Sequence, residues 1–154
     1  MIKLLILSLL LVPSLARAGE SPCENFLICG TYLAAEPTKP GYVQEVIFSD
    51  AGEGLVKYER VKSNGTERRS SASYFKFSAD GTFIVTDADL VKPYGLGICI
   101  NRVCTMSLAP VEAPLGLLVQ KMTFRFSETQ LISEKLLSYD SGETKTVSGT
   151  LIRK

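Results

Sequence analysis

Apolar and polar residues alternate along much of the chain, which is the pattern of β-strands with one buried face. Comparable alternating or β-branched stretches predict strands at residues 30–34, 42–49, 55–62, 82–85, 130–139 and 144–153, and one more that ends at Phe77. The clearest example runs from 118 to 126, where one face carries Leu118, Gln120, Met122, Phe124 and Phe126. Within 55–62 one face carries Leu55, Lys57, Glu59 and Val61.

Short turn sequences between these stretches predict tight hairpins. Asn64-Gly65 is the strongest of them, because a type I′ turn needs positive φ at both central residues. Asp80-Gly81 and Asn101-Arg102 predict two more. The stretch from Asp87 to Gly97 is expected to be less regular, since it contains Pro93 and two glycines. A further loop is expected around Pro110 and Pro114.

The order of these elements predicts an all-β fold, an antiparallel meander of about eight to ten strands. No amphipathic helix separates the strands, which argues against parallel βαβ units. A meander of this length most readily closes into a barrel, because closure removes exposed strand edges. A two-sheet sandwich is the alternative.

Two interpretations stay open for the segment before the first strand. Ser21 and Glu24 have the spacing of a capping box, and Pro22 would occupy the first helical position. These residues predict either one helical turn over 22–28, ended by Gly30, or a coil that leads into the first strand.

The first residues have the three parts of a secretory signal peptide in the usual order. Lys3 supplies a positive charge, residues 4–12 are apolar apart from one serine, and Ala16-Arg17-Ala18 fits the cleavage site. The apolar stretch is too short for a membrane-spanning helix, which needs ~20 residues. We therefore expect residues 1–18 to be removed and the mature protein to be secreted or periplasmic.

Removal of this segment leaves residues 19–154 as a single domain and changes the charge balance. Without Lys3 and Arg17, the 17 basic residues become 15 against 16 acidic ones, so the expected net charge is −1. A chain this close to neutrality lacks the basic surface of a nucleic-acid-binding protein. No later apolar run is long enough to span a membrane.

Four cysteines in an exported chain predict two disulfides, with a cysteine-only zinc site as the alternative. If Asn101-Arg102 is a two-residue turn, Cys99 and Cys104 face each other with Cα atoms ~4.5 Å apart. Cys23–Cys29 is then the second bridge by elimination, and it requires residues 23–29 to be a loop. A helix there would send the N-terminal cysteines to the hairpin instead.

The chain contains no histidine, which excludes Ser-His-Asp and Cys-His catalysis within it. We predict no catalytic residues, no metal site and no cofactor, and we expect the protein not to be an enzyme. Two carboxylate pairs, Asp50 with Glu53 and Asp87 with Asp89, are interpreted as solvated turn residues. An enzyme that uses carboxylates alone is the competing interpretation.

Aromatic residues on alternating strand positions are the other candidate feature. They are interpreted first as a packed core and second as the lining of a pocket. Tyr94 is expected to be exposed, because it lies in the stretch rich in proline and glycine. The candidate ligand-binding residues are Tyr32, Phe75, Phe77, Tyr94 and Phe124.

Gly30-Thr31-Tyr32 opens the first predicted strand at the place where lipocalin-like (calycin-type) barrels carry Gly-x-Trp. With the short N-terminal turn and the hairpin-linked meander, the chain resembles these barrels, although it contains no tryptophan. The resemblance implies a closed barrel of about eight strands with a cup-shaped interior for small apolar ligands. It transfers no binding residue to this sequence.

Two functions follow as expectations. The first is an exported, non-catalytic binding protein that holds a small apolar ligand in the barrel. The second is a protein–protein module, such as an inhibitor or an accessory subunit in the cell envelope or outside the cell. The oligomeric state is not predicted.

Overall fold

The structure, a computed structural model, describes residues 21–36, 39–87, 92–109 and 116–154. The predicted signal peptide, Pro110 and Pro114 lie outside the described residues. The elements are α1 (Pro22–Phe26), β1 (Gly30–Ala34), β2 (Tyr42–Asp50), β3 (Gly54–Ser63), β4 (Thr66–Phe77), β5 (Thr82–Asp87), β6 (Pro93–Ile100), β7 (Val103–Leu108), β8 (Leu117–Phe126), β9 (Gln130–Tyr139) and β10 (Thr144–Arg153). No helix among these described residues is long and apolar enough to cross a membrane.

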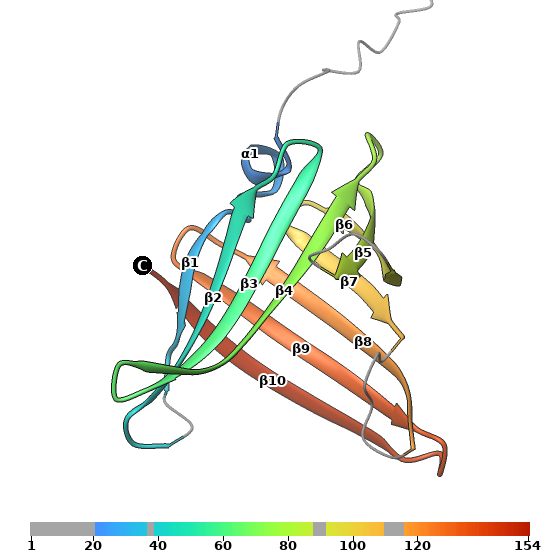
Figure 1. The fold of residues 1–154 in the computed structure, drawn as a ribbon. Coiled ribbons are helices and arrows are strands. Elements are labelled where there is room, and N and C mark those ends of the chain that lie inside the picture. Colours follow the sequence, from blue (N-terminus) through green and yellow to red (C-terminus); the bar gives the residue numbers. More distant parts are fainter. Residues whose placement is uncertain (1–20, 37–38, 88–91, 110–115) are drawn as a thin grey trace, which may run out of the picture.

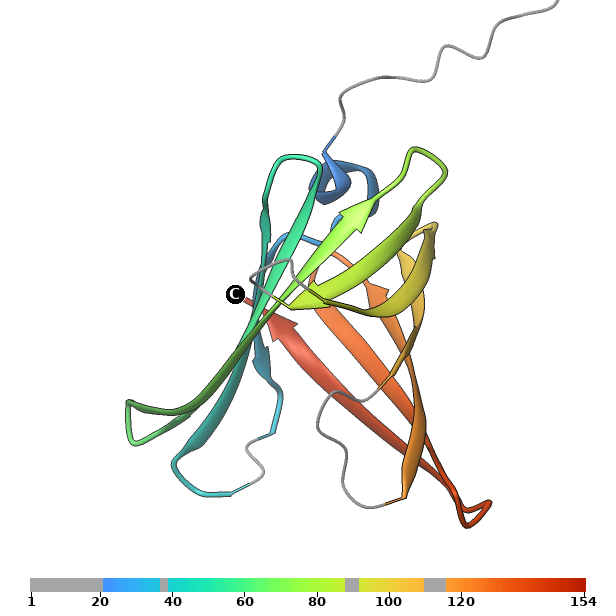
Figure 2. The same ribbon diagram turned by 45° about the vertical axis from the view of Figure 1, so that its right-hand side comes forward.

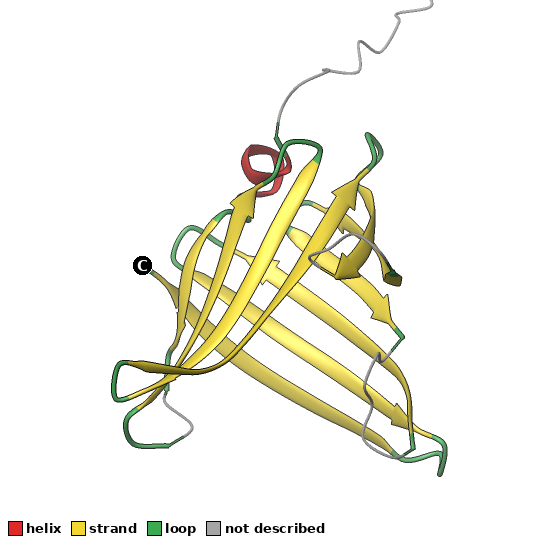
Figure 3. Ribbon diagram, viewed as in Figure 1, coloured by secondary structure: helices red, strands yellow, loops and turns green. Residues whose placement is uncertain are grey.

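The ten described strands form one closed antiparallel barrel (Figures 1 and 3). Each strand pairs with its neighbours in sequence, and β1 closes the barrel against β10 through Tyr32–Ala34 and Leu151–Arg153. The predicted all-β meander and its closure are confirmed, and the sandwich alternative is wrong.

Tight turns set the register of the hairpins. Asn64 and Gly65 have φ values of 48° and 80°, as the type I′ prediction requires. Asn101 and Arg102 have φ values of 48° and 68°, so Cys99 lies directly opposite Cys104. These two cysteines form a disulfide with Cα atoms 4.0 Å apart, in the predicted pairing.

The N-terminal segment combines a helical turn with a local disulfide, although the sequence predicts one or the other. The helical turn α1 is present and contains Cys23, and Cys23 is still bonded to Cys29. The helix ends at Phe26, and Leu27 adopts a left-handed conformation with φ of 53°. This reversal turns the chain back, so that Cys29 meets the helix it has just left.

The irregular stretch predicted from Asp87 to Gly97 is wrong over its last part, because β6 begins at Pro93. Proline is tolerated at the first residue of a strand, and here it lies beside a register shift at Val85/Thr86. A Cβ atom on Gly97 would lie 2.2 Å from Cζ of Phe83. The glycine therefore makes room for a core ring and does not mark a loop.

α1 covers one end of the barrel (Figures 1 and 2). The buried core cluster lies at this end, where Cys23 and Phe26 of α1 pack against it. Phe26 of α1 stacks on Phe77 with ring centroids 5.8 Å apart, and the Tyr32 hydroxyl donates to the Ile28 carbonyl at 2.8 Å. At the opposite end, the β3–β4 and β9–β10 hairpins project away from each other (Figure 2). The two ends of the barrel therefore differ in their packing.

Candidate functional site

The half of the barrel next to α1 is filled by aromatic side chains. Phe48, Phe75 and Phe124 are each at most 5% exposed, and their rings lie within 6.4 Å of one another or of neighbouring rings. The space left among these side chains is about 10 Å³. A cavity of that size holds at most one water molecule, so this half has no room for an organic ligand.

The sequence-predicted ligand-binding aromatics belong to this filled half. Tyr32, Phe75 and Phe124 are buried core residues, and Phe77 is partly buried against them. The structure brings them together as the packed-core interpretation expects.

Tyr94 is not the exposed loop aromatic that the sequence argument expected. It lies in β6, partly buried against the core, and its hydroxyl is 2.6 Å from the Ser73 hydroxyl of β4. The expectation fails for the same reason as the irregular stretch up to Gly97: proline and glycine occur in loops, but here they belong to strand β6.

The other half of the barrel contains a cavity of about 700 Å³. It arises because β1 has only 5 residues, whereas its neighbours β2 and β10 have 9 and 10. β1 ends at Ala34, which pairs with Leu151, and its last pair with β2 joins Leu33 to Glu45. The residues of β10 before Leu151 and those of β2 before Glu45 therefore have no partner in β1. The space between them is open to solvent, and Val147 on its wall is 42% exposed.

The wall of this cavity is partly apolar and partly polar. Ala34, Val147 and Leu151 contribute apolar surface, and Glu36, Gln44, Ser133 and Lys135 contribute charged or polar groups. A second cavity of about 260 Å³ includes Glu59, Arg69, Ser71 and again Lys135 among its lining residues. Lys135 therefore lies at the junction of the two cavities.

The barrel interior at this level carries charged side chains. Lys57 and Glu59 lie on the same face of β3 as the core residue Leu55, since side chains two positions apart share a face. Lys57 Nζ lies 2.8 Å from a carboxylate oxygen of Glu59, and the Gln44 amide donates to the other oxygen at 2.8 Å. Lys57 also lies 5.9 Å from the ring centroid of Phe124, at the boundary of the filled half.

These neighbours hold the Glu59 carboxyl in its charged form. Burial alone would raise the pKa of Glu59, but the attraction of Lys57 and Lys135 and the hydrogen bonds from Lys57 and Gln44 together lower it. Both carboxylate oxygens of Glu59 thus already have a partner, Lys57 on one and Gln44 on the other.

Lys135 of β9 is in the reverse situation. Burial lowers the pKa of Lys135, the attraction of Glu59 raises it, and repulsion from Lys57 and Arg69 lowers it further, with a net decrease. Lys135 is therefore attracted by one carboxylate, Glu59, and repelled by two cations, Lys57 and Arg69.

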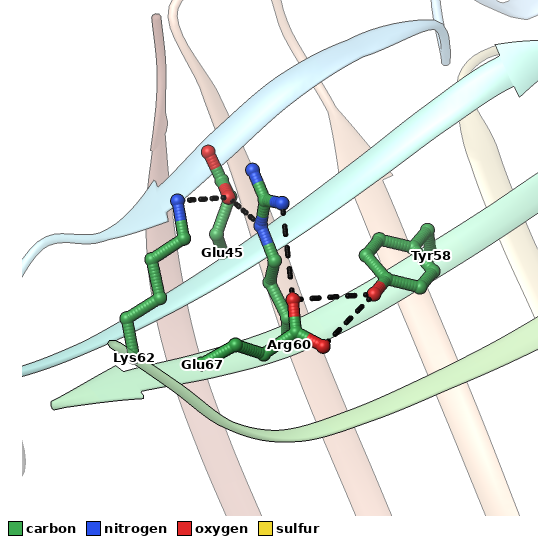
Figure 4. Close-up of polar contacts among 5 residues, drawn as sticks. All are labelled: Glu45, Tyr58, Arg60, Lys62 and Glu67. Carbon is green, nitrogen blue, oxygen red and sulfur yellow. Dashed lines mark hydrogen bonds and ion pairs between the residues drawn. The ribbon is translucent and has the colours of Figure 1, made fainter. Parts of the chain in front are cut away.

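A second charged cluster lies on the outer face of β2, β3 and β4 (Figure 4). Glu45 accepts a hydrogen bond from the Arg60 guanidinium and lies 3.4 Å from Lys62 Nζ, while Glu67 accepts from the Tyr58 hydroxyl at 3.2 Å. Two cations and two carboxylates balance here, and their contacts join three adjacent strands. This outer cluster supports the sheet and leaves no unmatched charge for a ligand.

The carboxylates considered at the sequence level do not converge. Asp50 accepts hydrogen bonds from the Ser21 hydroxyl and the Gly52 amide, and Glu53 lies 3.8 Å from Lys76 Nζ. Asp87 is the Cα partner of Ser73 on β4, and Asp89 lies outside the described residues. Within the part of the chain that the structure describes, no group of three potential metal ligands occurs.

The inner charged residues were missed in the sequence, although their pattern was visible. Leu55, Lys57, Glu59 and Val61 share one face of a predicted strand. A strand that is apolar at one end of its inner face and charged at the other fits a barrel with one filled and one open half.

Comparison with known proteins supports the fold alone. No family model matches the sequence, and no curated protein matches it. The chain is similar in structure to the protein in "Crystal Structure of Rv2717c from M. tuberculosis", with a TM-score of 0.56 and 14% sequence identity. The similar region covers 88% of this chain and 99% of that chain.

Proposed function

We propose that this protein is a non-catalytic binding protein that holds a small organic ligand in the open half of its barrel. The observation that carries the proposal is the cavity of about 700 Å³ below the end of β1. Pockets for small molecules and cofactors typically measure ~300–1,000 Å³ and combine apolar walls with a few polar groups. Ala34, Val147 and Leu151 provide such a wall here, beside Gln44 and Lys135.

Gly149 allows a direct test of this site. It lies on the inner face of β10 and lines the large cavity, and a Cβ atom there would meet only the Ser133 hydroxyl, at 3.6 Å. Gly149→Phe should therefore fill the cavity without straining the backbone. Thr146→Phe is the matched control, because Thr146 pairs with Leu136 on the outer face of the same two strands.

The measurement is native mass spectrometry of each protein purified from its own source. The wild type and Thr146→Phe should carry a small-molecule adduct that Gly149→Phe lacks. An adduct retained equally by all three proteins would contradict this location. A wild type that carries no adduct and binds no small molecule in a titration would contradict the function.

A protein–protein role is the second candidate function, and one observation favours it. The outer face of β5 and β6 exposes four large apolar side chains, Ile84, Leu96, Ile98 and Ile100, at 38–65%. Clustered exposed apolar residues are typical of interaction surfaces. Leu96→Lys with Ile100→Lys separates the two functions, because it should leave ligand binding unchanged and would abolish an association through this face.

A further inference from the structure

We propose that the ligand is an organic anion with an apolar body, whose charged group is bound by Lys135 and Arg69 where the two cavities meet. This inference rests on the proposed function and adds the chemical class of the ligand. It follows from the charges of the interior, from the partners those charges already have, and from the position of Lys135.

The first step is the local charge balance. Lys57, Arg69 and Lys135 all act electrostatically on one another or on Glu59. Register places these side chains on the inner faces of β3, β4 and β9, because Val61 pairs with Arg69 and Met122 with Lys135. Lys57, Arg69 and Lys135 outnumber the carboxylate of Glu59 where the two cavities meet, and Glu36 is a further carboxylate that lines the larger cavity. The charge around Lys135 is therefore positive, although the mature chain as a whole is expected to be slightly negative.

The second step is that the excess falls on two particular residues. Glu59 is already bound by Lys57 and Gln44, each at 2.8 Å. Neither Lys135 nor Arg69 has a carboxylate within ion-pair distance among the described residues. The register also directs Asp87 of β5 inward. Asp87 pairs with Ser73, which in turn pairs with Lys57, so it lies in the row of Lys57 and not in that of Arg69.

The third step is the solvation of Lys135. Its pKa is lowered by burial first and by the nearby cations in addition. A partly desolvated ammonium group with too little negative charge around it gains most from an anion, because a bound anion restores the lost solvation. The guanidinium of Arg69 adds paired donors that match a carboxylate, sulfonate or phosphate group.

The last step is the shape of the site. Lys135 lines both cavities, so an anionic group bound there lies at one end of the larger space. Ala34, Val147 and Leu151 then provide contact surface for the remainder of the molecule. This arrangement fits an amphipathic anion better than a purely apolar ligand.

The test uses two fluorescent probes that differ in one charged group. Anilinonaphthalene sulfonate is an organic anion with an aromatic body, and N-phenylnaphthylamine has the same aromatic body without the sulfonate. Titration of the wild type should give tighter binding of the sulfonate. Lys135→Gln should weaken sulfonate binding about tenfold or more, as expected for a lost charged hydrogen bond, and change neutral-probe binding less than about twofold.

Three further variants sharpen the test. Lys121→Gln removes the same charge from the outer face of the adjacent strand β8 and should leave both titrations unchanged. Lys135→Arg keeps the charge and should retain sulfonate binding. Glu59→Gln removes the carboxylate, so it should strengthen sulfonate binding, and this gain cannot come from a misfolded protein.

The outcomes separate the two proposals. Equal binding of both probes, with no effect of Lys135→Gln or Glu59→Gln, would overturn the anion inference. If both probes bound equally and Gly149→Phe abolished their binding, the proposed function would stand without the anion inference. Failure of the wild type to bind either probe would count against both.

Discussion

At the scale of single residues, the two halves of the barrel are distinguished by their inward-facing glycines. A Cβ atom on Gly97 of β6 would lie 2.2 Å from a ring carbon of Phe83 and 2.7 Å from the Thr105 carbonyl oxygen. A Cβ atom on Gly149 of β10 would meet one hydroxyl at an ordinary contact distance. Packing therefore requires glycine at position 97, in the filled half, but leaves room for a side chain at position 149, in the open half.

Alanine at these two positions should change stability in opposite directions. Gly97→Ala should lower the free energy of unfolding by about 1–3 kcal/mol, because the buried Phe83 ring and a backbone carbonyl block the added methyl group. Gly149→Ala should raise it by about 0.5–1 kcal/mol, because alanine loses less conformational freedom on folding. Urea unfolding of both variants measures the difference, and an equal loss in both would contradict the division into a filled and an open half.

Glu45 in the outer cluster should make the stability of the protein depend on pH. The hydrogen bond from Arg60 lowers the pKa of Glu45, burial opposes this, and Lys62 lowers the pKa further. A carboxyl whose pKa is lower in the folded state stabilises the fold above its unfolded pKa of ~4.3, and this contribution is lost as pH falls through the folded pKa. Glu45→Gln should therefore be less stable than the wild type at neutral pH, and the difference should shrink below about pH 4.

Urea unfolding of both proteins between neutral and acidic pH tests this dependence. Glu67→Gln is the matched control, since Glu67 belongs to the same cluster but its side chain is 41% exposed. Exposed ion pairs contribute at most about 1 kcal/mol, so the control should show a smaller effect. A stability difference for Glu45→Gln that stays constant with pH would contradict the assignment.

At the scale of elements, the sequence was informative wherever local chemistry determines the structure. Asn64-Gly65 identified its hairpin, because only a few residue types adopt two positive φ values in succession. The first part of β6, from Pro93 to Gly97, was expected to be irregular because glycine has two uses, in loops and at close contacts. Which of them applies to Gly97 depends on Phe83, a residue on another strand, and a local pattern does not contain that information.

The β6–β7 hairpin leads to a prediction about its disulfide. Cys99–Cys104 spans 5 positions, and a short loop removes little entropy from the unfolded chain. In a Cys23→Ala/Cys29→Ala variant, which keeps only this bridge, reduction should lower the free energy of unfolding by less than the ~3 kcal/mol expected for a 15-residue loop. Comparing oxidised and reduced protein leaves both buried cysteines in place, so packing changes little. Peptide mapping of the wild type that joined Cys23 or Cys29 to the hairpin would contradict the pairing.

At the scale of the whole molecule, closure of the barrel was predictable and its open half was not. Many antiparallel strands in sequence order favour closure whatever their lengths. The cavity instead depends on a difference in strand length, since β1 has 5 residues and its antiparallel neighbour β10 has 10. The predicted strands 30–34 and 144–153 already had these unequal lengths. Only their pairing, Tyr32 with Arg153 and Ala34 with Leu151, shows which end remains uncovered.

Export is the remaining whole-molecule prediction, and we propose that cleavage follows Ala18. Two disulfides are consistent with an oxidising compartment, and the cleavage pattern lies a few residues before Cys23. Because the peptidase needs small residues at the first and third positions of Ala16-Arg17-Ala18, Ala18→Leu should leave an uncleaved precursor. Arg17→Lys, which changes only the middle position, should be processed normally.

N-terminal sequencing of protein from the extracytoplasmic fraction measures the cleavage, and the mature chain should begin at Gly19. The two bridges connect the test to the fold. Protein retained in the cytoplasm should have reduced cysteines, because cytosolic thiols are kept reduced, and it should be less stable than the exported form. An exported chain that still began at Met1, or processing unaffected by Ala18→Leu, would contradict this cleavage site.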